Sequence, residues 1–475
     1  MPQEKFPAMK AHPWRFLVIT DAGVDSGRPA RVAPDGAGDW LTSLGVALDV
    51  PPPAGGGTNR IELRDPSDFG PGRVAEQLAS KKAGGAAAPG TAAPGAADQA
   101  AIDAVLHHPP FRRVESAWRG LRFLLEHAAD GVQVEALSVP RNHLVARFRE
   151  AIFEPELRRA DPPSLILADF DFSHRAEDVA AFTELAGMAK VLQAPLVASA
   201  SAAFFDLRFL VQVVALQDLL ARLADAAHAG WQTFQASEAA RWTLLTVNRY
   251  LQRAPYTAAE GGHAEAVSES NPESYLWGRG VWLVGAAVAR SVRTHGHALA
   301  ISGSQGGRFD GVATRAYPTA ANATSALAAE VPLSEMQTLE LSRAAFTPVV
   351  GPLRTSTVLL PMVLTTFRLT PGKLTLEATL AYQLTAARLA QFCGQLMEEL
   401  PAGKPAEVVS LVRKELTGFL GPLAGDHPED AVRVELREQQ SDGKKTTVAE
   451  VSVRSSATLE GKALEFDFAL PLTRD

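Results

Sequence analysis

The sequence predicts an α/β protein with α+β character: a body of covered, mixed sheets and long helices, followed by an antiparallel β layer. Between residues 100 and 300, amphipathic helical patterns alternate with short apolar strands, an order typical of a sheet with helices on its faces. Long helical patterns follow at residues 374–400 and 406–420. After them, three segments alternate apolar and polar residues, and Ser441-Asp-Gly443 marks a turn between the first two.

Composition excludes several classes of protein. The chain has 475 residues, 46 Lys and Arg against 53 Asp and Glu, and a net charge of −7, so it lacks the basic excess of a nucleic-acid-binding protein. With 46% hydrophobic residues it is not disordered, and with one cysteine it has no disulfide scaffold. Phe16–Ile19 is too short for an export signal, and no segment reaches the ~18 apolar residues of a membrane span. We therefore expect a cytoplasmic protein with no membrane insertion.

A low-complexity segment divides the chain. Residues 80–99 are rich in Ala, Gly and Pro, a composition that breaks helices and buries little surface, so we predict a flexible tether there. It separates a small αβ module at residues 1–79 from a body at 100–425, and the C-terminal strands occupy 426–475. In the small module we predict an edge-like strand at Trp14–Thr20, a strand at Arg60–Arg64, and helices at Asp39–Gly45 and Gly72–Ala79.

Helices and strands of the body follow from apolar periodicity. Phe111, Val114, Trp118, Leu121 and Leu125 share one helical face. The other predicted helices lie near Ile102–Leu106 and at residues 141–153, 176–193, 209–228 and 275–295, and the predicted strands are 132–139, 164–169 and 195–199.

In the C-terminal layer, each strand has one apolar face. The three faces comprise Val432, Val434 and Leu436; Ala449, Val451 and Val453; and Leu464, Phe466, Phe468 and Leu470.

Possible chemical sites each have a simpler structural interpretation. Gly303–Gly311 has the glycines of a phosphate-binding loop but not its lysine and hydroxyl, which favours a tight turn. His107 and His108 are adjacent, so they lack the spacing of a helical metal-binding pair. Asp169 and Asp171 follow an apolar strand and could hold a hard cation, although capping is the better explanation.

The lone thiol and the large aromatic residues also favour structural roles. Cys393 lies in an apolar helical segment and is interpreted as a buried thiol. We interpret the following aromatic residues as core or interface anchors rather than a ligand-stacking set: Trp231, Trp242, Tyr250, Trp277 and Trp282. We therefore predict no catalytic, cofactor-binding or metal-binding residues, and assembly rather than enzymatic activity.

One run of residues resembles a known family. Leu106–Leu125, with Trp118-Arg119-Gly120-Leu121 at its centre, resembles the large contractile-sheath subunit of bacterial type VI secretion systems (TssC, also called VipB or EvpB). Tyr275-Leu-Trp277-Gly278 matches a second motif of this family. Further segments that resemble the family in the same order are 165–174, 231–241, 253–256, 301–307, 333–348 and 380–392.

The module before the tether resembles the small sheath subunit (TssB, VipA), on residues 14–21 and 61–71. The chain thus resembles a natural fusion of the two subunits. This resemblance implies a homo-oligomer, a six-fold ring or helical tube around an inner-tube protein, in contact with baseplate components. It also implies that N-terminal and C-terminal strands of neighbouring protomers complete a shared sheet by strand exchange. The residues expected in these inter-protomer strands are Trp14, Phe16, Val18, Val432, Val434, Leu436, Val451, Val453, Phe466 and Phe468.

Two alternatives to a contractile-sheath subunit stay open, and the first of them follows from departures from the family pattern. The segments at 170–174, 345–349 and 390–394 differ from the family's motifs, and the tether replaces helical segments at the subunit junction. A non-contractile sheath-like adaptor or baseplate component is therefore the second hypothesis. The third is an enzyme that uses Asp169 and Asp171 with a divalent ion.

Overall fold

The computed structural model describes most of the chain. The described residues are 11–53, 57–82, 96–128, 131–216, 218–256, 269, 271–320, 323–368, 375–399, 405–441, 444–459 and 461–471. The centre of the predicted tether and the turn residues Asp442 and Gly443 lie outside them. Among the described residues, no helix combines the length and the apolar character needed to cross a membrane.

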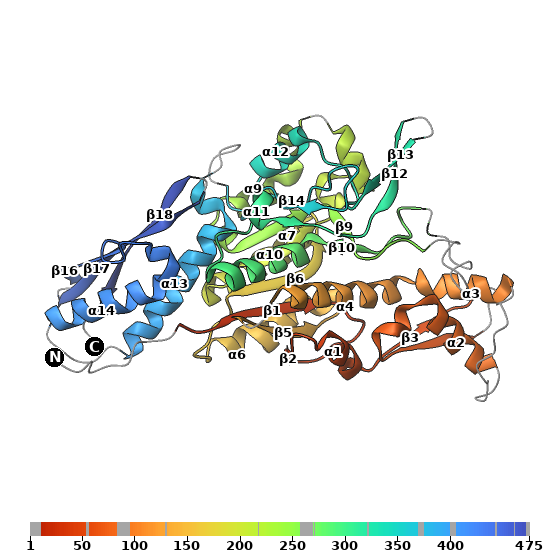
Figure 1. Cartoon of the computed structure of the whole chain (residues 1–475), viewed down its shortest axis with the longest axis horizontal. Helices are drawn as coiled ribbons and strands as arrows, with labels where there is room; N and C mark the ends of the chain where they lie inside the picture. The colour runs from red at the N-terminus through yellow and green to blue at the C-terminus, as the bar shows by residue number, and fades with distance from the viewer. Residues whose placement is uncertain are drawn as a thin grey trace.

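A seven-stranded sheet forms the centre of the molecule (Figure 1), in the order β14-β8-β7-β6-β1-β5-β2. Its strands are β1 (Trp14–Thr20), β2 (Ala30–Val32), β5 (Val132–Ser138), β6 (Leu165–Phe172), β7 (Leu196–Ala200), β8 (Thr243–Val247) and β14 (Thr347–Pro348). All neighbouring strands are parallel except β2, which is antiparallel to β5. The predicted α/β class with a mixed sheet is confirmed.

Side chains of the central strands alternate between two hydrophobic cores. On β1, Phe16 and Val18 belong to one core, whereas Leu17 and Ile19 belong to the other. Helices α4 (Pro109–Ala128) and α10 (Gly280–His295) supply the first core, and α7 (Ala176–Leu192) and α9 (Ala229–Gln235) supply the second. Because both faces are covered, the middle of β1 and the first half of β6 are runs of consecutive apolar residues.

The prediction that Trp14–Thr20 is an edge strand is wrong. β1 pairs with β5 along its full length and with β6 from Phe16 to Ile19, so both of its edges are occupied within the chain. Phe16 and Val18 are 0% and 1% exposed. A run of consecutive apolar residues is the pattern of an interior parallel strand, whereas an exposed edge strand alternates. In this fold Trp14, Phe16 and Val18 therefore lie inside the protomer and offer no strand edge to a neighbour.

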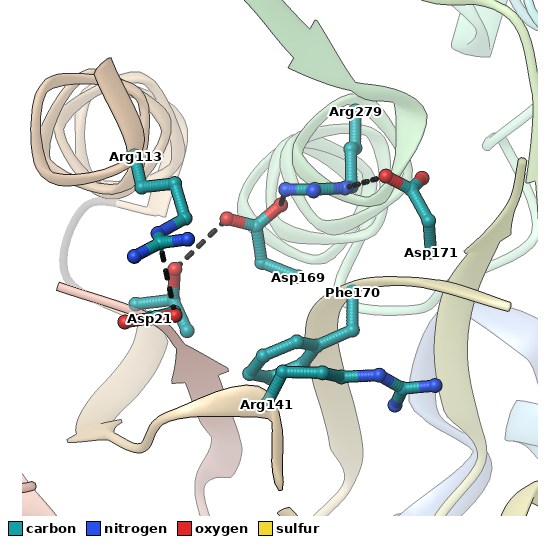
Figure 2. Close-up of a pocket in the computed structure, with 8 residues that line it drawn as sticks. Asp21, Arg113, Arg141, Asp169, Phe170, Asp171 and Arg279 are labelled. Carbon is teal, nitrogen blue, oxygen red and sulfur yellow. Dashed lines mark hydrogen bonds and ion pairs between the residues drawn. The ribbon is translucent and has the colours of Figure 1, made fainter. Parts of the chain in front are cut away.

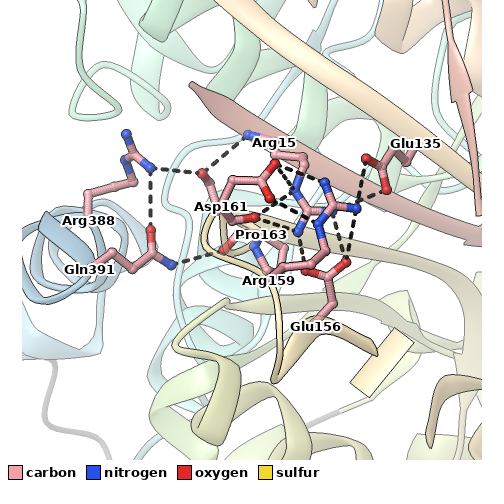
Figure 3. Close-up of polar contacts among 9 residues, drawn as sticks. Arg15, Glu135, Glu156, Arg159, Asp161, Pro163, Arg388 and Gln391 are labelled. Atoms are coloured by element: carbon pink, nitrogen blue, oxygen red, sulfur yellow. Dashed lines mark hydrogen bonds and ion pairs between the residues drawn. The ribbon is translucent and has the colours of Figure 1, made fainter. Parts of the chain in front are cut away.

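A buried arginine fixes β1 to the body (Figure 3). The Arg15 side chain is 1% exposed and forms ion pairs with Glu135 of β5, at 3.1 Å, and with Glu156 of helix α6 (Glu154–Glu156). It also donates hydrogen bonds to the carbonyl of Asp161 at 2.8 and 3.1 Å. A buried guanidinium needs such partners because the cost of removing it from water is several kcal/mol.

The same region contacts the C-terminal half of the chain. Helix α13 (Leu380–Glu399) carries Arg388, which donates to the carbonyl of His12. It also carries Gln391, which donates to the carbonyl of Pro163 at 3.0 Å. The described residues between 11 and 79 therefore share one sheet and one polar network with the body.

Most of the predicted helices are confirmed, but 209–228 is wrong and 275–295 starts too early, because Trp277–Arg279 is a strand and α10 begins at Gly280. The predicted helix 209–228 is instead a 3₁₀ helix at Leu210–Ala215, helix α8 at Leu219–Leu223 and a 3₁₀ turn at Ala226–His228. The chain breaks at Asp218, which has φ 54° and whose side chain accepts a hydrogen bond from the amide of Ala221. An N-cap of this kind starts a new helix, and apolar periodicity alone does not reveal it.

Other elements complete the body. Between β2 and α4 in the sequence come α1 (Ala37–Leu44), β3 (Val46–Val50), β4 (Asn59–Leu63), α2 (Pro71–Lys82) and α3 (Ala96–Leu106), of which α2 and α3 lie at the end of the molecule opposite the C-terminal sheet (Figure 1). Helix α5 (Leu144–Arg147) runs into a π-helical segment at Phe148–Phe153, within the predicted helix 141–153. The remaining strand pairs are β9 (Arg249–Leu251) with β10 (Trp277–Arg279), β11 (Arg308–Phe309) with β15 (Val358–Leu359), and β12 (Arg315–Ala320) with β13 (Ala323–Leu327). Two short helices, α11 (Gly303–Gly306) and α12 (Glu335–Arg343), belong to the same part of the sequence.

The C-terminal unit lies at one end of the molecule (Figure 1). Helices α13 and α14 (Pro405–Leu420) pack against an antiparallel sheet of β16 (Val432–Ser441), β17 (Lys444–Leu459) and β18 (Lys462–Pro471). The predicted antiparallel layer is confirmed. Its inner face is apolar and buried, and its outer face carries exposed ion pairs such as Arg437–Glu450 at 3.0 Å.

Candidate functional site

A polar cleft of about 210 Å³ lies at the carboxyl ends of β1 and β6 (Figure 2). β5 lies on one side of β1 in the sheet, and β6, the next strand in the sequence, lies on the other side of β1. In α/β sheets such a reversal of strand order leaves a crevice where ligands often bind. The residues that line the cleft are Thr20, Asp21, Arg113, Arg141, Asp169, Phe170, Asp171 and Arg279.

Charges in this cleft neutralise one another. Arg279 forms ion pairs with Asp169 at 3.2 Å and with Asp171 at 2.9 Å, and Thr20 donates a hydrogen bond to Asp169 at 2.8 Å. Burial alone lowers the pKa of Arg279, but the two carboxylates more than offset this effect and raise it. On the other side of the cleft, Arg113 lies 3.4 Å from Asp21. A cation at Asp169 and Asp171 would have to displace a guanidinium that already bridges them.

The glycine-rich segment after Ile301 is a packing element. Gly303–Gly306 forms helix α11, and a Cβ on Gly306 would lie 2.3 Å from the backbone of Ala300. A Cβ on Gly307 would lie 2.3 Å from the carbonyl oxygen of Leu360. These glycines are required because two backbones approach closely, which agrees with the structural interpretation of the segment.

His107 and His108 have different surroundings. The His107 ring lies 3.1 Å from Asp103 and 3.4 Å from Glu269, and the pKa of His107 is raised, chiefly by Glu269. Burial lowers the pKa of His108. Glu269 also pairs with Arg253 at 2.7 Å. The structure thus places the two histidines apart, and His107 belongs to a buried ion-pair cluster.

Cys393 and the aromatic residues lie where the structural interpretation places them. Cys393 is buried on α13, and burial raises its pKa to about 12, which favours the protonated thiol at neutral pH. Of the aromatic residues, Trp231, Tyr250, Trp277 and Trp282 are buried in the cores. Trp242 is half-buried, at the end of a 3₁₀ helix, and Tyr250 and Trp277 lie on strands.

The family-motif residues lie at close contacts between elements. A Cβ on Gly120 would lie 2.1 Å from the indole of Trp282, so only glycine allows α4 and α10 to cross at this distance. The Trp118 ring stacks on Phe69 at 5.5 Å, which connects α4 to the residues before the tether.

Their neighbours in the two motifs are also held in place. Arg119 donates to Glu115 at 2.8 Å, and Leu121 is fully buried. Trp277 donates from its indole to the carbonyl of Pro272 at 2.9 Å, and a Cβ on Gly278 would lie 2.6 Å from Gln252.

The C-terminal sheet has two long unpaired edges. β16 and β18 are each 10 residues long and pair only with β17, so no strand of the described part of the chain covers their outer edges. Val432, Val434, Val451 and Val453 are buried against the chain's own helices, whereas Leu436 is 39% exposed. Phe466 and Phe468 are half-buried and line an apolar groove of about 660 Å³ between β18 and α13.

The chain is similar to several known proteins. Over 273 aligned residues, the chain is 24% identical to the type VI secretion system sheath protein TssC1 of Pseudomonas aeruginosa. The alignment covers 52% of this chain. The chain spans about half (55%) of the length of that relative. Among solved structures it resembles a chain of the anti-feeding prophage baseplate, at 11% identity and a TM-score of 0.44, over 100% of this chain and 98% of that one.

It also resembles a chain of the contracted sheath of an extracellular contractile injection system (PVC), at 11% identity and a TM-score of 0.40, over 74% of this chain and 80% of that one. Residues 97–361 match the model of the VipB family, described as EvpB/VC_A0108, tail sheath N-terminal domain. This match covers more than half of the chain, from α3 to β15. The chain therefore belongs to the VipB (EvpB) tail sheath family.

Proposed function

We propose that this chain is a structural subunit of a type VI secretion-like contractile sheath, which self-assembles into rings or a helical tube. Membership of the tail sheath family and the name of its TssC1 relative support this function. The observation that carries it is the C-terminal sheet, whose two outer strands have long unpaired edges. Unpaired edges are sites where another strand can add.

The occupant we propose for such an edge is a strand of a second copy of this chain. Main-chain hydrogen bonds hold an added strand, and the groove beside β18 receives its apolar side chains. Phe466 and Phe468 line this groove together with Tyr382, Leu389 and Met397. Head-to-tail pairing of this kind does not use the same surface on both partners, so it produces rings or open helices.

We also propose that the chain combines two sheath subunits in one protomer. Residues 1–79 would correspond to the small subunit, 80–99 to the tether, 100–425 to the body and 426–475 to the strands for assembly. The pairing of β1 with β5 and β6 supports this proposal, since a separate small subunit would need a stable place in the protomer. An inner-tube protein and baseplate components are the partners proposed for the assembled, non-enzymatic cytoplasmic particle.

The test is the state of assembly of the full chain. We expect sedimentation velocity and negative-stain microscopy to show rings or tubes. The variant Phe466→Lys/Phe468→Lys places two charges in the groove and should abolish assembly while far-UV circular dichroism stays unchanged. As a control, Ser452→Lys/Thr458→Lys adds two lysines on the exposed outer face of β17 and should assemble normally.

Two outcomes would contradict the proposal. A monomer at all salt and protein concentrations would exclude a sheath subunit. A defined small oligomer that is unaffected by the groove lysines would indicate the adaptor instead. Deletion of residues up to Thr20 does not separate these possibilities, because it removes the strand between β5 and β6.

A further inference from the structure

Three side chains that are distant in the sequence meet beyond the carboxyl ends of β6 and β7. His174 follows β6, Asp206 follows the 3₁₀ helix Ala202–Phe205, and His228 ends the 3₁₀ turn before α9. Nε2 of His174 lies 2.7 Å from Oδ1 of Asp206, and the two imidazole centroids are 4.2 Å apart. One potential ligand atom from each of the three residues lies within 4.8 Å of the others.

The backbone determines which nitrogen of each ring is free. Nε2 of His228 lies 3.1 Å from the carbonyl oxygen of Phe204, which can only accept, so this nitrogen carries the proton. Nδ1 of His228 then has a lone pair. It is buried and has no hydrogen-bond partner among the described residues, and His228 itself is 1% exposed.

The second imidazole faces the carboxylate. Nε2 of His174 donates a hydrogen bond to Oδ1 of Asp206 at 2.7 Å, and Nδ1 lies 3.3 Å from the carbonyl oxygen of Ala227. A cation bound here takes the place of the Nε2 proton, and Nδ1 then donates to Ala227. One nitrogen lone pair, one nitrogen with an exchangeable proton and one carboxylate oxygen thus converge, and the carbonyls beside the two rings are the outer partners typical of metal-binding histidines.

Asp206 is held for this role by its backbone. Its φ is 55°, a left-handed conformation that aspartate and asparagine tolerate better than most residues, and its amide donates to the carbonyl of Ala203 at 3.3 Å. Arg222 lies 3.8 Å from its second oxygen, Oδ2, and donates to the carbonyl of Phe205 at 2.9 Å. Arg222 therefore orients the carboxylate so that Oδ1 faces the two rings.

We propose that His174, Asp206 and His228 bind one divalent transition-metal ion of the Zn²⁺ type. Two imidazoles and one carboxylate are a ligand set that Zn²⁺ prefers, and three protein ligands leave the fourth position open. The site differs from Asp169 and Asp171, where a guanidinium already occupies the space between the carboxylates. It would connect the loops after β6 and β7 on one face of the body, independently of the C-terminal sheet.

The test is metal binding by the full chain after treatment with a chelator. Isothermal titration with Zn²⁺ should give one site per chain. Asp206→Asn keeps the left-handed backbone and removes the charge, and His228→Gln keeps a donor for the carbonyl of Phe204. Each should weaken binding by more than the ~10–100-fold that loss of an outer partner costs. His427→Gln, at an exposed histidine paired with Glu429, should bind as the wild type does.

Cobalt gives a second readout that does not depend on stability. Co²⁺ at this site should produce the visible absorption of a tetrahedral complex in the wild type and in His427→Gln, and lose it in Asp206→Asn and His228→Gln. The proposal is overturned if the wild type binds Zn²⁺ no more tightly than Asp206→Asn, or if His427→Gln loses as much affinity as the site variants. Circular dichroism confirms that each variant is folded.

Discussion

The two principal sheets of this molecule differ in the length of their edge strands. The seven-stranded sheet ends in β2, with three residues, and β14, with two, and such short edge strands offer little to an added strand. The C-terminal sheet ends in β16 and β18, with 10 residues each. The first sheet is therefore closed to pairing and gives the protomer its stability, whereas the second is open and suited to joining protomers.

The largest difference between the two sheets is expected when one arginine in each is replaced by methionine. Arg15→Met removes a buried charge from the seven-stranded sheet and leaves Glu156, whose side chain is 5% exposed, without its main partner. We expect a loss of about 3–5 kcal/mol in the free energy of unfolding. Chemical denaturation measures it, with Arg433→Met on the C-terminal sheet as the control. Arg433 is 76% exposed, and equal losses in the two variants would contradict the distinction.

Acid provides the second test, through the buried cluster of the body. Burial alone raises the pKa of Glu269, but Arg253 and His107 more than offset this and lower it to about 2. The stability that ionised Glu269 contributes is present above its unfolded-state pKa of 4.5 and is lost as the pH falls from 4.5 toward 2. We expect the denaturation midpoint of the wild type to fall steeply over this interval.

The control for the acid test is Glu269→Gln, which removes this titration. Its stability should depend less on pH between 4.5 and 2 than that of the wild type. Parallel curves for the two proteins would show that Glu269 does not contribute.

Glycines in helices of the two regions should respond with opposite signs. Gly120→Ala on α4 brings a Cβ within 2.1 Å of Trp282, so we expect a loss of about 1–3 kcal/mol from overpacking. Gly394→Ala on α13 meets no atom within 4 Å and should gain about 0.5–1 kcal/mol from helix propensity. Thermal denaturation of both variants measures these two changes in stability. A tolerated alanine at position 120 would show that α4 and α10 do not need their close contact.

The smallest effect is expected on the outer face of the C-terminal sheet. Arg437 and Glu450 form an exposed ion pair across β16 and β17, at 3.0 Å, with side chains 65% and 40% exposed. Arg437→Met should change the free energy of unfolding by less than about 1 kcal/mol, and less still at high salt. A larger loss in denaturant titrations would mean that this face is covered in solution.

The spacing of apolar residues predicts the helices and strands that bury one face and expose the other. The apolar positions of α4 recur at helical spacing, and those of β16, β17 and β18 alternate, so both patterns could be recognised from the sequence. β1 could not be placed correctly in the same way. Its apolar run Phe16–Ile19 is compatible with an interior strand, but the sequence pattern does not account for Arg15, and only the partners Glu135 and Glu156 explain how this charge is buried.

The candidate sites differ in the same respect. Asp169 and Asp171 are two residues apart near a recognisable strand end, but their partner Arg279 comes from β10 and no spacing predicts it. His174, Asp206 and His228 come from three separate segments, so no motif connects them in the sequence. Such sites form only when the order of the parallel strands brings their loops together.

The position of β1 also has a consequence for how the chain folds. Thr20 bonds to Asp169, 149 residues later, and Arg15 pairs with Glu135, 120 residues later. During synthesis the first strand of the sheet therefore leaves the ribosome long before either of its neighbours and has nothing to pair with. Contacts this distant in the sequence slow folding and leave an apolar strand exposed, so the nascent chain has its greatest need of chaperones before β6 is made.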